Sequence, residues 1–135
     1  MKVADFIRSE MERPFVWGET DCCSTADRWV RIRAGFSPLE RYGRTIRSRQ
    51  DALRWTGADA SRLQSAVLDV MGKTGFAIGQ DPQAGDVGLV TVDRMRRLAM
   101  AIFDGRIWTS RDPDGFICAS ARYTLCSWRV PWPIR

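Results

Sequence analysis

Histidine is absent from the whole sequence, and lysine occurs only at Lys2 and Lys73. The side chain that most often moves protons near neutral pH is therefore missing, and so is the commonest nitrogen ligand of zinc. The formal charge of +5 comes almost entirely from arginine, whose guanidinium group suits protein interfaces better than an ammonium group does. The composition argues against a conventional Cys–His enzyme and favours a docking surface.

Long apolar runs are also absent. No stretch approaches the roughly 18 apolar residues of a membrane helix, so we expect a soluble protein without membrane insertion. Residues 1–15 carry charges throughout and lack the apolar segment of a secretory signal, so the protein is expected to leave a cell only by lysis or inside a particle. A length of 135 residues predicts one domain over 1–135.

The four cysteines are at positions 22, 23, 118 and 126. Two adjacent thiols cannot easily share one tetrahedral ion, and no histidine completes a zinc site. Without a secretory signal, a disulfide framework is the minority interpretation. We expect reduced thiols, no metal and no other cofactor.

Arginines cluster within 28–33 and 41–49, a pattern also found in nucleic-acid-binding proteins. Acidic residues are interspersed with them and no recognition motif accompanies them. Nucleic acid is therefore the last-ranked partner, and an anionic or acidic protein partner accounts for the same charge.

Apolar residues recur at helical spacing in two early segments, residues 3–11 and 22–34. Thr20 or Asp21 is predicted to cap the second helix and Gly35 to end it. Two helices are therefore expected before residue 36.

Residues 36–48 contain proline and glycine and are predicted to be a surface connection. Ser48 is expected to cap a helix over 49–57, and Ser61 to open another helix that ends at Gly72. Helices are thus expected to fill the first half, about 1–75.

Strand patterns fill the second half, about 84–130, before a Pro-Trp-Pro tail at 131–135. The predicted strands are 87–92, 98–103, 106–109, 116–119 and 125–130. Helices that precede an antiparallel sheet predict an α+β architecture.

Cys22 follows Asp21 at the predicted start of the second helix. The partial positive charge and free amides of a helix start lower a thiol pKa and favour the nucleophilic thiolate. A buried cysteine on an amphipathic helix is an equally good interpretation of Cys22 from local physics alone. Cys23 is expected in the core.

The segment from Pro14 to Gly18, the Asp21-Cys22 pair and the helix after it resemble the nucleophile helix of the NlpC-type, papain-like cysteine hydrolases. Ala84-Gly85-Asp86-Val87 resembles the turn that opens the first sheet strand in that family, and 127–130 resembles its short branch encoded in bacteriophage and prophage tail-gene clusters. The resemblance implies a papain-like fold with N-terminal helices packed on a C-terminal antiparallel sheet, and a groove containing Trp17, Asp21 and Asp86.

The same resemblance places Ala99 where the family has its histidine base, and Trp108 near the position of the residue that orients the imidazole. Neither side chain can accept the thiol proton or protonate a leaving amine. We expect Trp108 to fill the vacated groove. Cys22 would then be a vestigial or unconventional nucleophile.

Two functions are consistent with these residues. The first is a bacteriophage tail-tip component without hydrolase activity, assembled in the host cytoplasm into the virion tail beside distal-tail and hub proteins, as the resemblance implies. The second is an active peptidoglycan hydrolase that uses Cys22 with an unconventional or partner-supplied base.

The other tryptophans are expected to have structural roles. Trp29 and Trp55 fit apolar helix faces and are predicted to be core residues. Trp132, in the tail, is as consistent with docking on a neighbour as with packing on its own domain.

Overall fold

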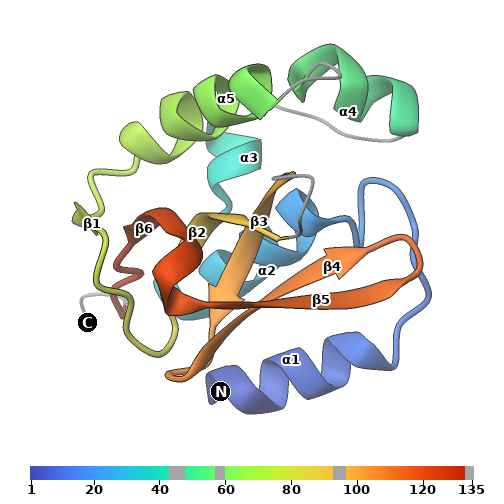
Figure 1. Ribbon diagram of the computed structural model, residues 1–135. Coiled ribbons are helices and arrows are strands. Elements are labelled where there is room, and N and C mark those ends of the chain that lie inside the picture. The colour runs from blue at the N-terminus through green and yellow to red at the C-terminus, as the bar shows by residue number, and fades with distance from the viewer. Residues whose placement is uncertain (43–47, 57–59, 93–96, 133–135) are drawn as a thin grey trace.

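The computed structural model describes residues 1–42, 48–56, 60–92 and 97–132 (Figure 1). The helices are α1 (Val3–Met11), α2 (Cys22–Ala34), α3 (Pro38–Arg41), α4 (Arg49–Thr56), α5 (Ala60–Gly72) and the short 3-10 helix η1 (Ala121–Tyr123). The strands are β1 (Ile78–Gly79), β2 (Val87–Thr91), β3 (Leu98–Phe103), β4 (Ile107–Asp112), β5 (Gly115–Ser120) and β6 (Thr124–Trp128). The predicted α+β class is confirmed.

The strands form one sheet in the order β1-β6-β2-β3-β4-β5, and each neighbouring pair is antiparallel. β2 and β3 pair from Val87 with Ile102 to Thr91 with Leu98. Antiparallel neighbours can be joined by short turns and need no crossover helix. The helices can therefore collect before the sheet, where α2 packs mainly on β3 (Figure 1).

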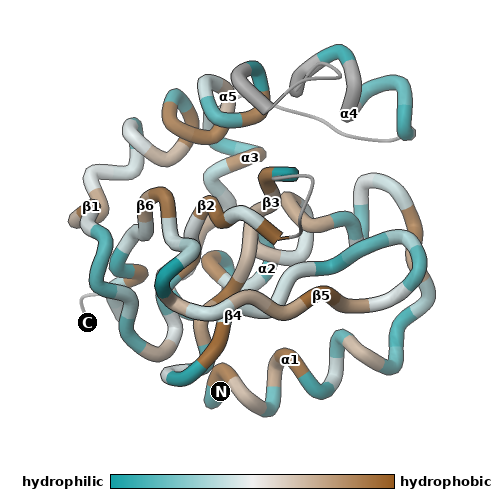
Figure 2. The backbone as a smooth tube through the Cα atoms, viewed as in Figure 1, coloured by the Kyte–Doolittle hydropathy of each residue, from teal (hydrophilic) through white to brown (hydrophobic). Residues whose placement is uncertain are grey.

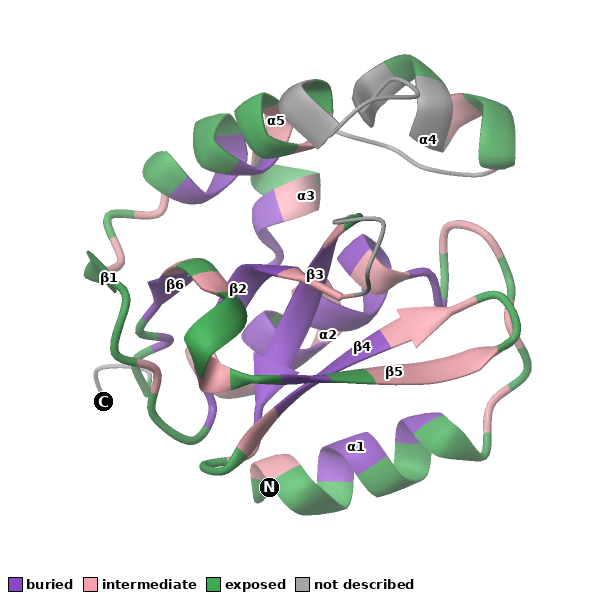
Figure 3. Cartoon of the chain, in the orientation of Figure 1, coloured by how far each residue is buried: buried purple, intermediate pink, exposed green. Residues whose placement is uncertain are grey.

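The main core lies between the helices and one face of the sheet. Alternate strand residues, such as Met100 and Ile102, turn toward α1 and α2, where Trp29 packs on Phe6 with ring centroids 5.3 Å apart. Trp29 is buried as predicted, and its indole N–H donates to the Gly85 carbonyl at 2.8 Å. Buried residues accordingly follow α2, β2 and β3, and hydrophobic colour runs along the same strands (Figures 2 and 3).

A second cluster occupies the opposite face of the sheet around Trp108, which is 0 % exposed. The Trp108 ring packs against Phe103 with centroids 5.0 Å apart, and its N–H donates to the Thr124 hydroxyl at 2.7 Å. The ring also lies directly over Gly88, where a Cβ atom would stand 2.9 Å from Trp108 Cζ2. The Trp108 side chain of β4 therefore contacts Gly88 of β2 and Thr124 of β6.

The ends of α2 agree with the sequence prediction. Asp21 has extended backbone angles and accepts a hydrogen bond from the Ser24 amide at 2.9 Å, as an N-cap residue does. Gly35 ends the helix with φ of 90°, in the left-handed region that glycine enters without steric cost. The caps place Cys22 as the first residue of α2.

The connection predicted over residues 36–48 contains a helical turn that we did not predict, α3. Ser37 accepts a hydrogen bond from the Glu40 amide and Pro38 takes the first helical position. The Ser37 hydroxyl also donates to Asp27 at 2.5 Å. Residues 43–47 of this connection lie outside the described residues.

The predicted helix and strand bounds differ from the structure by a few residues. Ser48 accepts from the Asp51 amide and caps α4 as expected, and α5 begins at residue 60. β4 runs to Asp112 because the turn at 113–114 is tight enough to pair Asp112 with Gly115. β6 ends at Trp128, and the two-residue strand β1 pairs with it.

The Trp55 side chain, predicted to be in the core, lies outside the described residues.

The tail packs on its own domain as far as Trp132. The Arg33 guanidinium lies 4.8 Å from the centroid of the Trp132 ring, and its Nε donates to the Val130 carbonyl at 2.7 Å. The Trp132 side chain is nevertheless 55 % exposed. The sequence left open whether the tail docks on a neighbour or packs on its own domain, and Val130 and Trp132 contact Arg33 of their own domain. Residues 133–135 lie outside the described residues.

Candidate functional site

The loop before α2 is fixed by two buried side chains. The Asp21 carboxylate accepts from the Gly18 amide at 2.6 Å, and from the Ser24 amide and hydroxyl, each at 2.9 Å. The Thr20 hydroxyl accepts from the Val16 amide at 2.6 Å and donates to the Pro14 carbonyl at 2.9 Å. These bonds satisfy backbone groups that a loop would otherwise bury unpaired, and they hold Cys22 at a defined place.

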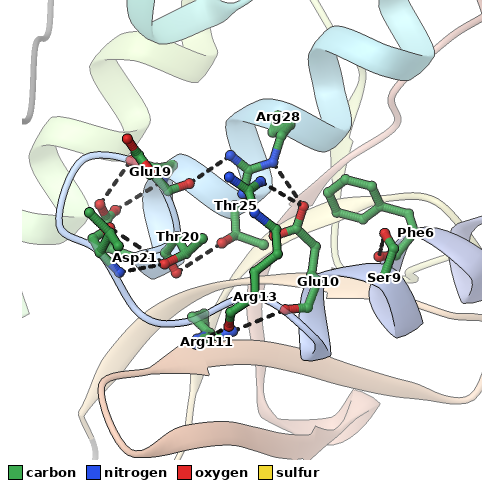
Figure 4. Close-up of polar contacts among 12 residues, drawn as sticks. Phe6, Ser9, Glu10, Arg13, Glu19, Thr20, Asp21, Thr25, Arg28 and Arg111 are labelled. Atoms are coloured by element: carbon green, nitrogen blue, oxygen red, sulfur yellow. Dashed lines mark hydrogen bonds and ion pairs between the residues drawn. The ribbon is translucent and has the colours of Figure 1, made fainter.

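An arginine from α2 ties the same loop to α1 (Figure 4). Arg28 donates from Nε and Nη2 to the two carboxylate oxygens of Glu10, at 2.8 Å each, and from Nη1 to the Glu19 carbonyl at 2.7 Å. Planar guanidinium and carboxylate groups match in this two-bond arrangement. The contact joins α1, the loop and α2 into one unit.

A second arginine reaches this unit from β4. Arg111 donates to the Glu10 carbonyl at 3.1 Å and to the Arg13 carbonyl at 2.9 Å (Figure 4). Its guanidinium lies 4.6 Å from the centroid of the Phe116 ring. Arg111 thus fixes the end of α1 to the sheet, a role that the sequence analysis did not identify because nothing in the local pattern links residue 111 to residues 10 and 13.

Two thiols with different chemistry begin α2. The pKa of the Cys22 thiol is lowered, chiefly because the Cys23 thiol stabilises the Cys22 thiolate by hydrogen bonding and also because the Met100 amide donates to it; burial and the Asp21 charge oppose this effect. The pKa of Cys23 is raised well above its ordinary value, because its thiol donates to Cys22 and is buried. Cys22 is half-buried, and Cys23 is buried in the core, which was predicted for Cys23 alone. Of the two thiols, Cys22 is therefore the one that ionises first.

Cys22 opens onto a cavity of about 230 Å³, which we call the Cys22 cavity. Its walls come from the loop before α2, the start of α2, α4, α5, β3, β4 and β5. Aromatic and aliphatic side chains lie beside arginines. The lining residues include Phe15, Trp17, Asp21, Cys22, Cys23, Arg49, Leu63, Val92, Arg97, Leu98, Ala99, Ser110, Arg111, Asp112, Pro113 and Ile117.

Ala99 lines this cavity together with Cys22, as the sequence prediction requires. A methyl group cannot accept a proton. The two carboxylates that line the cavity are already engaged: Asp21 caps α2, and Asp112 accepts from the Asp114 amide at 3.0 Å and lies 3.9 Å from Arg97. Among the described residues around Cys22, a free general base is therefore missing.

Trp108 does not lie in the Cys22 cavity, which corrects our expectation that it fills the groove. It packs in the second cluster, with Val90, Phe103 and Ala119. Three residues of β4 line the cavity instead, Ser110, Arg111 and Asp112. The Ser110 hydroxyl donates to the Met100 carbonyl at 2.8 Å.

Asp86 also lies away from the Cys22 cavity. Its carboxylate accepts from the Gln83 amide and from Arg129 Nε, each at 2.9 Å, and so closes the turn before β2. Burial raises the pKa of Asp86 despite the Arg129 charge. Asp86 is a structural turn residue, and the groove prediction holds for Trp17 and Asp21 alone.

The aromatic wall of the cavity comes from the loop itself. Phe15 and Trp17 pack edge to face with ring centroids 4.9 Å apart, an arrangement that aromatic pairs prefer. Both rings line the Cys22 cavity. Together with Leu98 and Ile117 they give the cavity apolar walls. The Arg111 guanidinium lies 5.9 Å from the centroid of the Phe15 ring.

In the described ranges, His, Cys, Asp and Glu side chains do not gather in threes that could bind a metal ion. None of the helices described has the length and apolar character that crossing a bilayer requires.

The chain was compared with protein families, curated proteins and solved structures. A family model described as a domain of unknown function, DUF6950, matches residues 1–130. Curated proteins and solved structures give no match. Since the matched region contains every helix and strand described above as well as the Cys22 cavity, the chain belongs to the DUF6950 family.

Proposed function

We propose that this chain is a papain-like, NlpC-type domain that has lost its catalytic base and serves as a structural docking component of a bacteriophage tail tip. The observation that carries the proposal is the pairing of Cys22 with Ala99 in one cavity. A thiol at a helix start shares this cavity with the strand position where the resembling hydrolases have histidine, and alanine cannot act as a base. A groove without its base can persist as a contact surface.

The neighbours of this component are distal-tail and hub proteins, and its location is the virion tail after assembly in the host cytoplasm. The resemblance to the short phage branch supports this part of the proposal. The abundance of arginine supports it as well, because guanidinium groups are enriched where proteins dock. Arg49 and Arg97 at the Cys22 cavity would face acidic or polar groups of such a neighbour.

Genetic complementation tests the proposal. A phage that lacks this gene would receive either the wild-type chain or Cys22→Ala, and infectious particles and their tail composition would be measured. We expect both chains to enter the tail and to restore infectivity equally. Failure of Cys22→Ala to restore infectivity, with normal incorporation into particles, would contradict the structural role. Absence of the wild-type chain from purified tails would contradict the location.

A second candidate function is peptidoglycan hydrolysis by Cys22, and one observation favours it. The pKa of Cys22 is lowered by the Cys23 thiol and the Met100 amide, so part of the activation that a nucleophile needs is present without histidine. Incubation of the protein with isolated peptidoglycan, beside Cys22→Ala, separates the candidates. Muropeptides released by the wild-type chain alone would establish hydrolysis; we expect release by neither.

A further inference from the structure

Two thiols are placed together at the Cys22 cavity. Cys22 and Cys23 are consecutive residues at the start of α2, and both line the cavity. The other two cysteines lie elsewhere: Cys118 is exposed on β5 and Cys126 lies on β6. The cavity therefore presents a dithiol, one member of which is accessible and the other buried.

The two thiols differ in how readily they ionise. Two interacting thiols lose their two protons in two steps that belong to the pair. Here the Cys22 thiol loses its proton first, and the Cys23 thiol retains its own. A thiolate that is open to a cavity is the form that reacts with oxidants, and a protonated thiol beside it can resolve the product. The Met100 amide and the Ser110 hydroxyl border the same space.

We propose that Cys22 and Cys23 are a redox-active dithiol that a hydroperoxide converts into a disulfide between the two residues, with Cys22 as the oxidised thiol and Cys23 as the resolving thiol. This inference does not depend on the tail-tip role. It needs only the two thiols, the cavity that admits a small peroxide, and the peroxide itself as oxidant.

The reaction proceeds in two displacements. The Cys22 thiolate attacks one peroxide oxygen; an S–O bond forms, the O–O bond breaks, and the departing oxygen takes a proton from solvent. The Cys23 sulfur then attacks the Cys22 sulfur, so that an S–S bond forms and the S–O bond breaks. The hydroxide leaves with the Cys23 proton as water. The dithiol supplies the two electrons that reduce the peroxide.

The backbone at the start of α2 must move to admit this disulfide. Neighbouring Cα atoms lie about 3.8 Å apart across a trans peptide, closer than the roughly 4.4–6.8 Å of ordinary disulfides. The bond is therefore strained and easily reduced. Because Cys22 and Cys23 lie between Asp21 and Ser24, oxidation disturbs the cap in which Asp21 accepts from the Ser24 amide and hydroxyl.

Mass spectrometry of the full chain tests the proposal. The protein would be treated with hydrogen peroxide in the presence of dimedone, which traps sulfenic acids, and digested with trypsin. The peptide that ends at Arg28 contains both thiols and neither Cys118 nor Cys126. We expect this peptide to lose two hydrogen atoms without binding dimedone, and to regain them with dithiothreitol.

Two variants assign the roles. Cys23→Ser should bind dimedone at Cys22, because the resolving thiol is gone. Cys22→Ser should lower the rate at which this peptide is oxidised by about tenfold or more. Dimedone on Cys22 in the wild-type chain, conversion of Cys22 to sulfinic acid, or equally fast oxidation of Cys22→Ser would each overturn the proposal.

Discussion

Glu10 and Arg28 form a two-bond ion pair, with both nitrogen–oxygen distances at 2.8 Å, although Glu10 is only 3 % exposed. Removing one partner of such a pair leaves a buried charge uncompensated, which costs far more than the pair contributes at a surface. The pair connects α1 to α2 and to the loop that precedes Cys22. The stability of the fold and the position of the thiol therefore depend on the same contact.

We predict that Arg28→Met lowers the free energy of unfolding by about 3 kcal/mol, because it removes both short hydrogen bonds of the buried Glu10 carboxylate and leaves Arg13, at 3.5 Å, to balance its charge. Urea denaturation measures the change. Arg8→Met is the matched control, since Arg8 pairs with Asp5 at 3.7 Å on the exposed face of α1 and should change stability by about 0.5 kcal/mol or less. Equal effects of the two substitutions would contradict the importance of the Glu10 pair.

Gly88→Ala should lower the free energy of unfolding by about 1–3 kcal/mol, because the new Cβ would crowd the Trp108 ring and the Cys126 carbonyl. Gly79→Ala is the control. It also replaces a strand glycine, but its Cβ would meet no atom within 4 Å. Thermal unfolding of both variants, followed by tryptophan fluorescence, checks the difference, and an unchanged melting temperature for Gly88→Ala would mean that Trp108 does not pack over residue 88.

The Trp108 contact also shows where sequence reasoning failed. Every residue of β3, from Leu98 to Phe103, is apolar. Alternation of polar and apolar residues, the usual guide to which face a strand residue occupies, is therefore absent in β3. The register with β4 pairs Trp108 with Phe103 and sets its ring over Gly88, away from the Cys22 cavity, and this register arises from pairings across the sheet.

Local signals succeeded where the cause was local. Asp21 as the cap of α2, Gly35 as its end and Cys22 at its first turn follow from interactions within four residues. Asp86 was misplaced because its partner, Arg129, lies 43 residues away in the sequence. The same holds for Arg111, which contacts backbone carbonyls about a hundred residues earlier.

Asp27 should make stability depend on pH in acid. Burial raises the pKa of Asp27 above its ordinary value of 3.8, so the folded state holds the proton more tightly than the unfolded state does. The resulting stabilisation is complete below the unfolded pKa and is lost as pH rises through the folded pKa. We expect the stability of the wild-type chain, relative to that of Asp27→Asn, to fall between about pH 3 and pH 6. A difference that stays constant across this range in urea titrations would contradict the prediction.

Asp21 opposes ionisation of Cys22 by its charge while it caps α2. Asparagine caps helices about as well as aspartate, so Asp21→Asn removes the charge and keeps the bond from the Ser24 amide, while its NH2 group replaces the oxygen that accepts from the Gly18 amide and the Ser24 hydroxyl. We predict a lower Cys22 pKa in this variant, seen as a shift of the iodoacetamide alkylation profile to lower pH. Alkylation must be followed on the tryptic peptide that ends at Arg28, because Cys118 is exposed. A shift to higher pH would show that the cap, not the charge, controls the thiol.

Placing a base at position 99 tests the relation between the Cys22 thiol and the residue 99 side chain. Ala99 is 9 % exposed and lines the same cavity of about 230 Å³ as Cys22, so a larger side chain at position 99 has space at this cavity. A protonated imidazole stabilises a neighbouring thiolate. We predict that Ala99→His raises the alkylation rate of Cys22 near neutral pH by about tenfold, the effect of lowering a thiol pKa by one unit in the range where ionisation limits the rate.

Ala99→Asn is the control for this substitution, because asparagine is polar and close in size but does not ionise. The rate increase should appear in the histidine variant alone and should vanish when Cys22 is replaced by serine. Equal alkylation rates in the two folded variants would mean that the residue 99 side chain does not reach the thiol. A rate increase accompanied by new release of muropeptides from peptidoglycan would show that the missing imidazole is the principal difference between this cavity and a working Cys–His site.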